Sequence, residues 1–373
     1  MPPETSAAPL TTPAGLAEGA AAHPLVAPDG SLVDPVLLVD RDAPDHPRAL
    51  GAALASERIL IGIASRAATG ALAAALDFTL VPRDLVGTDR SNAGLSTTPT
   101  LVGVDDPHAA AAALAAAVHA TPQAATVLVG LLRSEFPAAR AALEAESLGY
   151  STLLGGGEFR RWLDATARPG LPAAAADPVL VRREAGPFGE VLRVTLNRPE
   201  RRNAYSSEMR SALVAALQVG RGLARADGLP GPSGTGFRIV LDGVGPSFCA
   251  GEELGEFSAA PDPVMAHLVR TSAGAAFPLL DLSDRIEARV HGRCVGAGVE
   301  LAAFAGRVLA APGTTFGLPE VGMGLIPGAG GTVSLPRRIG RWRTLYLALS
   351  GVELDLDTAL AWRLVDGVSD WTG

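Results

Sequence analysis

Residues 295–302 read VGAGVELA, and this stretch does most to decide the fold because its glycines lead directly into a helical pattern. The first turn of a helix leaves backbone N–H groups without partners, with the positive end of the helix dipole behind them. Small residues such as Gly296 and Ala297 let a ligand approach this backbone closely. Glu300 falls in the same first turn, so its carboxylate can face the same cavity. The stretch therefore predicts a helix start that presents amides and a carboxylate to one point.

Two further stretches extend this pattern. PSFCAGEEL at residues 246–254 leaves a predicted strand and turns at Gly251. The amides freed at such a turn can converge with those of the helix start to form an oxyanion hole, which stabilises an enolate or a tetrahedral oxyanion. FGLPEVG at residues 316–322 holds Glu320 in a Gly-flanked loop. Two carboxyl groups can divide acid and base roles where their environments differ.

Each of these signals also has an ordinary structural explanation. A Gly-rich turn before a helix is usually only a turn, and short glycine patterns often match by chance. On spacing alone, Glu300 fits a surface residue favoured by the helix dipole, and Glu320 fits a solvated loop residue. From these residues alone the class of reaction stays open.

Composition excludes several function classes. The chain has 373 residues and a formal charge of −8, and its 31 basic residues are all Arg. An acidic chain without a basic cluster argues against nucleic acid or an anionic membrane as partner. The absence of Lys excludes Schiff-base chemistry and a P-loop lysine. Two cysteines supply neither a disulfide framework nor a Cys-rich zinc site. With no signal peptide and no apolar run long enough to span a membrane, we expect a soluble, cytoplasmic protein.

The chain divides into three predicted parts: a flexible tail at residues 1–34, an N-terminal domain at 35–178 and a core at 179–373. In the second part, apolar runs predict strands at 36–39 and 59–63, and Ala- and Leu-rich patterns predict helices at 108–118, 126–132 and 137–163. In the third part, strands are predicted at 191–196, 237–241 and 286–291, and helices at 206–223 and 298–305. Strands alternating with helices imply an α/β fold with largely parallel pairing.

Taken together and in this order, the stretches resemble the crotonase (enoyl-CoA hydratase/isomerase) superfamily from about residue 191 to residue 368. LNRPERRNA at 196–204 is similar to the family's first conserved stretch, and LPRRIG at 335–340 is close to a later one. The resemblance implies an α/β fold with a crotonase-like ββα spiral core at 179–373. Before it we expect a partial, degenerate crotonase-like α/β domain rich in helices.

The resemblance also implies roles for individual residues. Glu300 would position and deprotonate water, Glu320 would exchange the proton at C2 of the thioester, and the N–H groups of Glu252 and Ala297 would form the oxyanion hole. Contacts to substrate and coenzyme A are expected from Arg202, Ala204, Ala250, Glu253, Leu254, Gly296, Pro319 and Gly328. The family needs no metal or redox cofactor, because coenzyme A belongs to the substrate.

Because isomerases of this family typically keep only the second glutamate, both glutamates together favour hydration of a 2-enoyl-CoA thioester. The alternatives are an isomerase, a hydrolase, a decarboxylase, a cofactor-independent oxygenase, or a catalytically inactive scaffold of the same fold. The resemblance further implies an acyl-CoA substrate, a place in fatty acid metabolism, and a homo-oligomer, either a trimer or a hexamer.

Two departures from the family pattern are informative. Gly255 stands where many relatives have Lys, so phosphate contacts must come from Arg, and Arg202 is the best candidate. Relatives continue after the segment at 364–366 into helices that cap the site, whereas residues 106–161 of this chain read like those helices. Residues 59–82 faintly echo residues 286–312 but lack the glutamate. We therefore expect the helices at 108–163, from the same chain or a neighbouring subunit, to cover the core through a broad apolar contact.

Overall fold

The computed structural model describes residues 8–86, 98–167, 170, 177–186, 189–227, 236–257 and 262–370. In the N-terminal part the strands are β1 (Leu10–Thr11), β2 (Val36–Asp40), β3 (Ile59–Ile63), β4 (Phe78–Pro82) and β5 (Leu101–Val104). The helices are α1 (Pro13–Ala17), α2 (Ala49–Ala55), α3 (Ala71–Ala75), η1 (Arg83–Leu85), α4 (Pro107–Ala120), α5 (Pro122–Arg133), α6 (Ala139–Leu154) and α7 (Gly157–Ala165).

In the C-terminal part the strands are β6 (Val179–Gly186), β7 (Gly189–Leu196), β8 (Arg238–Gly243), β9 (Ile286–Val290), β10 (Arg293–Val295), β11 (Arg307–Ala310), β12 (Thr315–Gly317) and β13 (Gly367–Val368). The longer helices are α8 (Ser207–Asp227), α9 (Pro263–Ala273), α10 (Ala276–Leu282), α11 (Ala297–Ala302), α12 (Gly331–Ser350), which bends at Gly340, and α13 (Leu356–Ala361). Short 3-10 helices are η2 (Pro199–Arg201), η3 (Leu254–Glu256), η4 (Ser283–Arg285) and η5 (Glu320–Met323).

The strands form two main sheets whose pairing is largely parallel, as the alternation of strands and helices predicted. The N-terminal sheet has the order β1-β2-β3-β4-β5, and all of its pairs are parallel. The C-terminal sheet has the order β13-β11-β9-β8-β7-β6, and only β6 and β7 pair in antiparallel fashion. A third, two-stranded sheet pairs β10 with β12. The mixed α/β fold class expected for the C-terminal half is confirmed.

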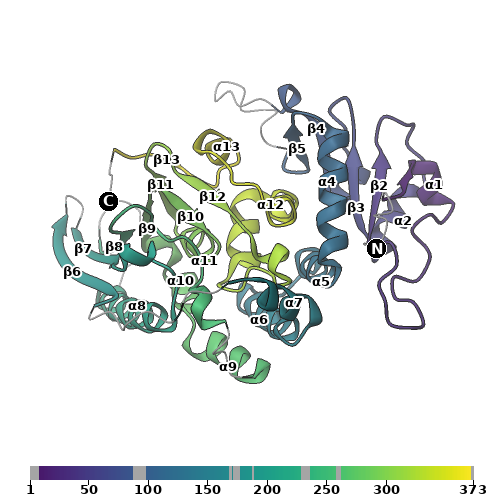
Figure 1. The fold of residues 1–373 in the computed structure, drawn as a ribbon. Coiled ribbons are helices and arrows are strands. Elements are labelled where there is room, and N and C mark those ends of the chain that lie inside the picture. The colour runs from purple at the N-terminus through teal and green to yellow at the C-terminus, as the bar shows by residue number, and fades with distance from the viewer. Residues whose placement is uncertain are drawn as a thin grey trace.

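Helices of the N-terminal half join the two sheets into one body. Figure 1 shows α4 and α5 between the N-terminal sheet and α12, with α6 and α7 beside them. A single buried apolar cluster runs from the N-terminal sheet through these helices to the C-terminal sheet. It includes Leu128 and Tyr150 of the helices together with Ile326 and Leu345 of the C-terminal half. The expected broad apolar contact between the halves is confirmed.

The flexible tail predicted at residues 1–34 is wrong for most of its length. β1 pairs with β2, and Leu16 of α1 is 1% exposed within a second apolar cluster. The guanidinium of Arg58 donates to the carbonyl oxygens of Ala21 and His23, which ties the following loop to the start of β3. Elements of two to five residues are too short to show a hydrophobic periodicity. The prediction therefore relied on the composition of the segment, which is typical of a flexible tail. Residues 1–7 lie outside the described residues.

The single helix predicted at 137–163 is also wrong, because the chain breaks into α6 and α7 at the glycines 155–157. The composition also predicts a linker at 165–172; the structure describes only residues 165–167 and 170 of it, and Ala165 ends α7. Within the described ranges, no single helix is long and apolar enough to cross a bilayer, and α4 and α5, which pass that test only as a pair, meet at 106°.

Candidate active site

The two Gly-rich stretches come together at the carboxyl end of the C-terminal sheet. The amide of Val295 donates to the carbonyl oxygen of Cys249 at 3.1 Å, so the turns run side by side. Gly251 and Gly296 both have positive φ, at 107° and 55°. A Cβ on Gly296 would lie 3.4 Å from the Cα of Gly251 and 2.5 Å from an oxygen of Glu320. Glycine is therefore required at position 296 by both conformation and space.

The backbone amides at this junction differ in whether they have partners. Those of Ala250, Glu253 and Gly296 donate to the carbonyl oxygens of Arg202, Tyr205 and Gly317. The N–H groups of Glu252 and Ala297 donate in none of the hydrogen bonds found among the described residues. Ala297 is the first residue of α11, so the helix offers its N–H no partner. The arrangement can hold an oxyanion between two backbone donors.

Glu300 reaches this junction from α11, whose side chains are all buried. Its Oε2 accepts hydrogen bonds of 2.8 Å from the amides of Ala329 and Gly331, at the start of α12. Its Oε1 is buried without a hydrogen-bond partner among the described residues. Burial raises the pKa of Glu300 well above its usual range, and the nearby carboxyl group of Glu320 acts in the same direction. One oxygen is thus fixed by the backbone and the other is free for chemistry.

Glu320 stands at the start of η5, where Pro319 precedes it. Its side chain is buried, and Oε2 has no hydrogen-bond partner in the described part of the chain. Burial, together with the nearby carboxyl group of Glu252, raises the pKa of Glu320 to about 8. Glu320 lines a groove at the surface, whereas Glu300, Gly296 and Ala297 are not among the residues that line that groove or the cavity beside it. Glu300 lies behind this surface, close enough to Glu320 for the two carboxyl groups to interact.

Most of the other predicted residues line one groove of about 580 Å³. They are Arg202, Ala204, Ala250, Glu252, Glu253, Leu254, Pro319 and Glu320. Gly328 instead lines an adjoining cavity of about 380 Å³, which shares Glu252, Glu253 and Phe257 with the groove. A Cβ at position 328 would lie 2.2 Å from the ring of Tyr150, so glycine there makes room for that ring.

Asn203 fixes the loop that carries Arg202. Arg202 and Asn203 are left-handed, with φ of 51° and 54°, a conformation that Asn tolerates better than most residues. The Asn203 side chain is fully buried, accepts from the amide of Arg198 at 2.6 Å, and donates to the carbonyl oxygens of Val244 and Ser247 at 2.9 Å. This ties the loop to the end of β8 and leaves the Arg202 side chain exposed at the groove.

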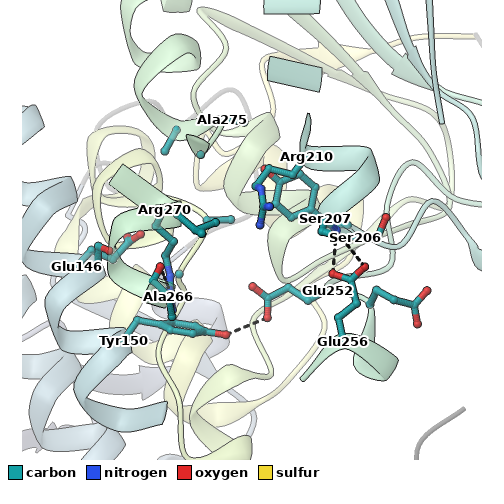
Figure 2. A pocket seen from close by; sticks show the side chains of 18 of the residues that line it. Glu146, Tyr150, Ser206, Ser207, Arg210, Glu252, Glu256, Ala266, Arg270 and Ala275 are labelled. Atoms are coloured by element: carbon teal, nitrogen blue, oxygen red, sulfur yellow. Dashed lines mark hydrogen bonds between the residues drawn. The ribbon is translucent and has the colours of Figure 1, made fainter. Parts of the chain in front are cut away.

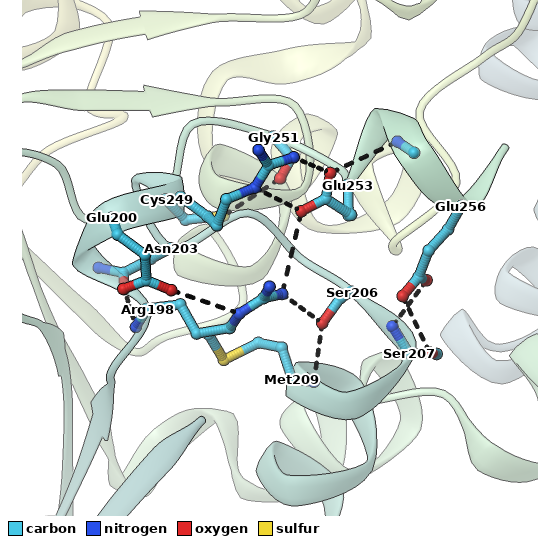
Figure 3. Close-up of polar contacts among 12 residues, drawn as sticks. Arg198, Glu200, Asn203, Ser206, Ser207, Met209, Cys249, Gly251, Glu253 and Glu256 are labelled. Atoms are coloured by element: carbon cyan, nitrogen blue, oxygen red, sulfur yellow. Dashed lines mark hydrogen bonds and ion pairs between the residues drawn. The ribbon is translucent and has the colours of Figure 1, made fainter. Parts of the chain in front are cut away.

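Arginines of the same loop are engaged in structure, as Figure 3 shows. Arg198 is 2% exposed and donates to the hydroxyl of Ser206 at 2.9 Å. Arg201 forms an ion pair with the buried carboxylate of Glu253. Because the Arg201 guanidinium is already paired with Glu253, Arg202 is better placed than Arg201 to bind an anionic ligand.

The N-terminal half supplies part of the cavity, which the sequence did not predict. Glu146 and Tyr150 of α6 line it together with Arg210 of α8 and Arg270 of α9. Figure 2 shows the Tyr150 hydroxyl directed at the Glu252 carboxylate, which accepts a hydrogen bond from it at 3.2 Å. The covering role of this segment was expected, but nothing in its local pattern marked individual side chains that face the site.

Glu146 binds the same helix start as Glu300. Its carboxylate accepts from the amides of Gly330 and Thr332 at 2.8 Å, and also from the Thr332 hydroxyl. Burial raises the pKa of Glu146 to about 7, against the opposing effect of these hydrogen bonds. The two glutamates thus accept from alternate amides at the beginning of α12, one from each half of the molecule.

The residues of this site also bear on two other kinds of chemistry, attack by a cysteine thiol and binding of a metal ion. Cys249 and Cys294 are buried, and burial raises the pKa of the Cys249 thiol to about 12, which leaves it a poor nucleophile. Within the described ranges, no group of three or more His, Cys, Asp and Glu side chains is placed to hold a metal ion.

Comparisons with known proteins place this geometry in context. The family model described as enoyl-CoA hydratase/isomerase matches residues 188–370. A probable enoyl-CoA hydratase, EchA14 of Mycobacterium tuberculosis, is 33% identical over 198 residues, covering 53% of this chain and 72% of the relative. A mevalonyl-coenzyme A hydratase of Aspergillus fumigatus is 33% identical, covering 49% of this chain and 64% of the relative. The chain spans just under two thirds of the length of the first curated relatives it matches.

Among solved structures, one described as an enoyl-CoA hydratase subunit from Geobacillus kaustophilus is 30% identical, with a TM-score of 0.43. The match covers 51% of this chain and 68% of that one.

Proposed function

Since this chain belongs to the enoyl-CoA hydratase/isomerase family, we propose that it adds water across the double bond of a 2-enoyl-CoA thioester. The observation that carries the proposal is a pair of carboxyl oxygens, Oε1 of Glu300 and Oε2 of Glu320, that have no hydrogen-bond partner among the described residues. An isomerase needs one carboxyl group to move a proton, whereas hydration uses a second one to activate water. A site with two free carboxyl oxygens fits hydration better.

In the proposed reaction the thioester carbonyl oxygen accepts hydrogen bonds from the N–H groups of Glu252 and Ala297. These donors stabilise the negative charge that develops on that oxygen as the enolate forms. The charge lies at the start of α11, where the helix dipole also favours it. Because both donors belong to the backbone, the side chains around them are free to differ from those of relatives.

Protons move through the two glutamates. Glu300 accepts a proton from water as the water oxygen bonds to C3, and Glu320 delivers a proton to C2, which completes the addition. Two carboxyl groups so close together do not readily ionise together, so the pair holds one proton. Burial favours the neutral form of both glutamates, and at Glu300 the hydrogen bond from Ala329 opposes this effect. The assignment of Glu300 as the base and Glu320 as the acid therefore rests on the family resemblance and on the two positions matching its glutamates, and variants of the two glutamates test it.

The coenzyme A part of the substrate is proposed to lie in the 580 Å³ groove, with its acyl group in the adjoining cavity. Arg202, exposed at the groove, is the candidate for a phosphate contact.

Turnover of crotonyl-CoA, followed as loss of the conjugated enone absorbance, tests the proposal. We expect the absorbance to fall as 3-hydroxybutyryl-CoA forms. Growth of the same absorbance from a 3-enoyl-CoA, without loss from crotonyl-CoA, would identify an isomerase instead. Release of free coenzyme A thiol would identify a hydrolase, and no reaction with any of these esters despite their binding would identify a scaffold.

A further inference from the structure

We propose that the acyl group of the substrate carries a carboxylate at its far end, bound in the cavity by Arg210 and Arg270. This inference rests on the proposed acyl-CoA function. An acyl pocket for a simple fatty chain needs only apolar walls, because a methyl-ended chain gains nothing from charged groups and pays for their desolvation. The wall of this cavity nevertheless carries two guanidinium groups, and the nearby Glu146 and Glu252 favour the charged form of one of them, Arg270. What the two groups offer a ligand is their unused N–H donors.

The acidic side chains that line the cavity already have partners. Glu256 accepts from the amide and the hydroxyl of Ser207, and Glu252 accepts from Tyr150. Glu146 is bound at the start of α12, and Glu253 is paired with Arg201. The hydrogen-bonding capacity of these carboxylates is thus directed at groups of the protein.

The donors are less fully used. A guanidinium group carries five N–H donors in a rigid fork. Arg270 donates to the carbonyl oxygen of Ala266 at 2.7 Å and stacks its guanidinium on the Tyr150 ring, 3.9 Å from the centroid. The Nε of Arg210 is buried without a hydrogen-bond partner among the residues the structure describes. The cavity therefore has donors to spare, and its ligand should bring acceptors.

The two arginines act on the same space. They come from different helices, α8 and α9, and both line the cavity. In Figure 2, Arg210 lies above Glu252, and Arg270 lies beside it, over the Tyr150 ring. Burial lowers the pKa of Arg270, the nearby Tyr150, Glu252 and Glu146 oppose that effect, and Arg210 adds a smaller lowering. An anion that reaches both arginines can accept from both forks. A terminal carboxylate fits the charge and the donor geometry, whereas a hydroxyl or ketone supplies no charge.

The test compares binding of saturated coenzyme A esters, which cannot be hydrated. Matched pairs are used, from butyryl- and succinyl-CoA to octanoyl- and suberoyl-CoA, so that each pair differs by a terminal carboxylate. At one chain length or more we expect the carboxylate ester to bind at least about tenfold more tightly by calorimetry, the effect of a charge-assisted hydrogen bond in a partly buried site. Arg210→Met and Arg270→Met should each reduce this preference, and Arg→Lys at the same positions should retain part of it.

Arg225→Met provides the matched control, because Arg225 lies on α8 in an exposed position away from the cavity. It should leave the preference unchanged. Equal or tighter binding of the methyl-ended esters at every chain length would overturn the inference, as would a preference that survives in both Met variants. A preference for carboxylate esters with no hydration of their 2-enoyl forms would preserve the inference and reject the hydratase. If no ester binds, both the carboxylate-binding inference and the proposed acyl-CoA function are rejected.

Discussion

In the N-terminal sheet, β3, α3 and β4 follow in the same order as β9, α11 and β11 of the C-terminal half, where β10 is inserted between β9 and α11. Each set consists of two parallel neighbouring strands joined through a short helix. The fourth residue of α11 is the fully buried Glu300, whereas the fourth residue of α3 is the exposed Ala74. The comparison teaches that the strand order carries the architecture and that a few side chains and turns carry the chemistry.

The two halves also differ in how they hold buried acids. Asp77, just before β4, is fully buried and paired with Arg133, with Arg341 of α12 at 3.6 Å. Glu300 is fully buried too, but it is held by amides and keeps one oxygen free. Asp77, whose charge is neutralised by arginines, stabilises the contact between the halves. Glu300 has no such counter-charge paired with it in the described part of the chain and keeps one oxygen for the proposed reaction.

The largest expected effect comes from separating the halves. Residues 179–373 expressed alone should aggregate or fail to fold, because the surface of α12 that packs on α4, α5 and α6 would be exposed. Each Å² of apolar area left exposed lowers the folding stability by about 25 cal/mol relative to burying it. Co-expression of residues 1–178 should restore soluble protein, measured by size-exclusion chromatography. A monodisperse, active fragment without its partner would show that the halves are independent.

The next effect concerns the structural acid. Asp77→Asn should lower the free energy of unfolding by about 3–5 kcal/mol, because it removes one partner of a buried ion pair and leaves arginines without a counter-charge. Urea denaturation measures the change. Asp105→Asn is the matched control, since Asp105 in the same half pairs with Arg83 at 2.8 Å in an exposed position and should matter little. An Asp77 variant as stable as the wild type would contradict the structural role of Asp77 and, with it, the distinction between a structural and a catalytic buried acid.

The catalytic acids should affect turnover instead. Glu300→Gln and Glu320→Gln should each slow hydration roughly a hundredfold or more, the usual contribution of a general acid or base. Binding of acyl-CoA should change little, because the proposed oxyanion donors are backbone groups. Ala74→Gln, at the fourth position of α3, is the control and should keep full activity. Full hydration activity in the Glu300 variant, with loss only in the Glu320 variant, would reject the hydratase.

The smallest effect is expected at the groove. Arg202→Ala should raise the dissociation constant for coenzyme A esters by about two- to fivefold, the scale of an exposed charge interaction, and weaken its dependence on salt. Calorimetry at two ionic strengths measures both quantities. Arg182→Ala, exposed on β6, is the control. Unchanged affinity at low salt would remove Arg202 from the binding site.

The sequence predicted elements whose signals are local. The apolar run at 59–63 is β3, and the alternating residues at 286–291 contain β9. Glu300, Glu320 and the two turns were singled out because they lie in continuous motifs. The structure places the two turns side by side and the Glu320 carboxyl group near Glu300, and their catalytic roles stay predictions. The split between α6 and α7 was missed although three consecutive glycines signal it.

Other features could not be predicted because they depend on partners far away in the chain. The Glu146 carboxylate accepts a hydrogen bond from the amide of Gly330, 184 residues away in the sequence, and no local pattern around either residue indicates this contact. Arg210 and Arg270 look like ordinary helix-surface residues until α8 and α9 are packed around the cavity. The buried segment around Leu16 was hidden for a similar reason, since its partners are β2 and α2.

The attachment of Glu146 to the start of α12 has a consequence for synthesis. Domains generally fold from the N-terminus as the chain is made. Helices α4 to α7 therefore leave the ribosome before the surface they cover exists, and their apolar faces must wait for α12. We expect this interval to be the vulnerable period of biogenesis, in which chaperones hold the nascent chain. Contacts so distant in sequence also make the final docking slow compared with formation of the N-terminal sheet.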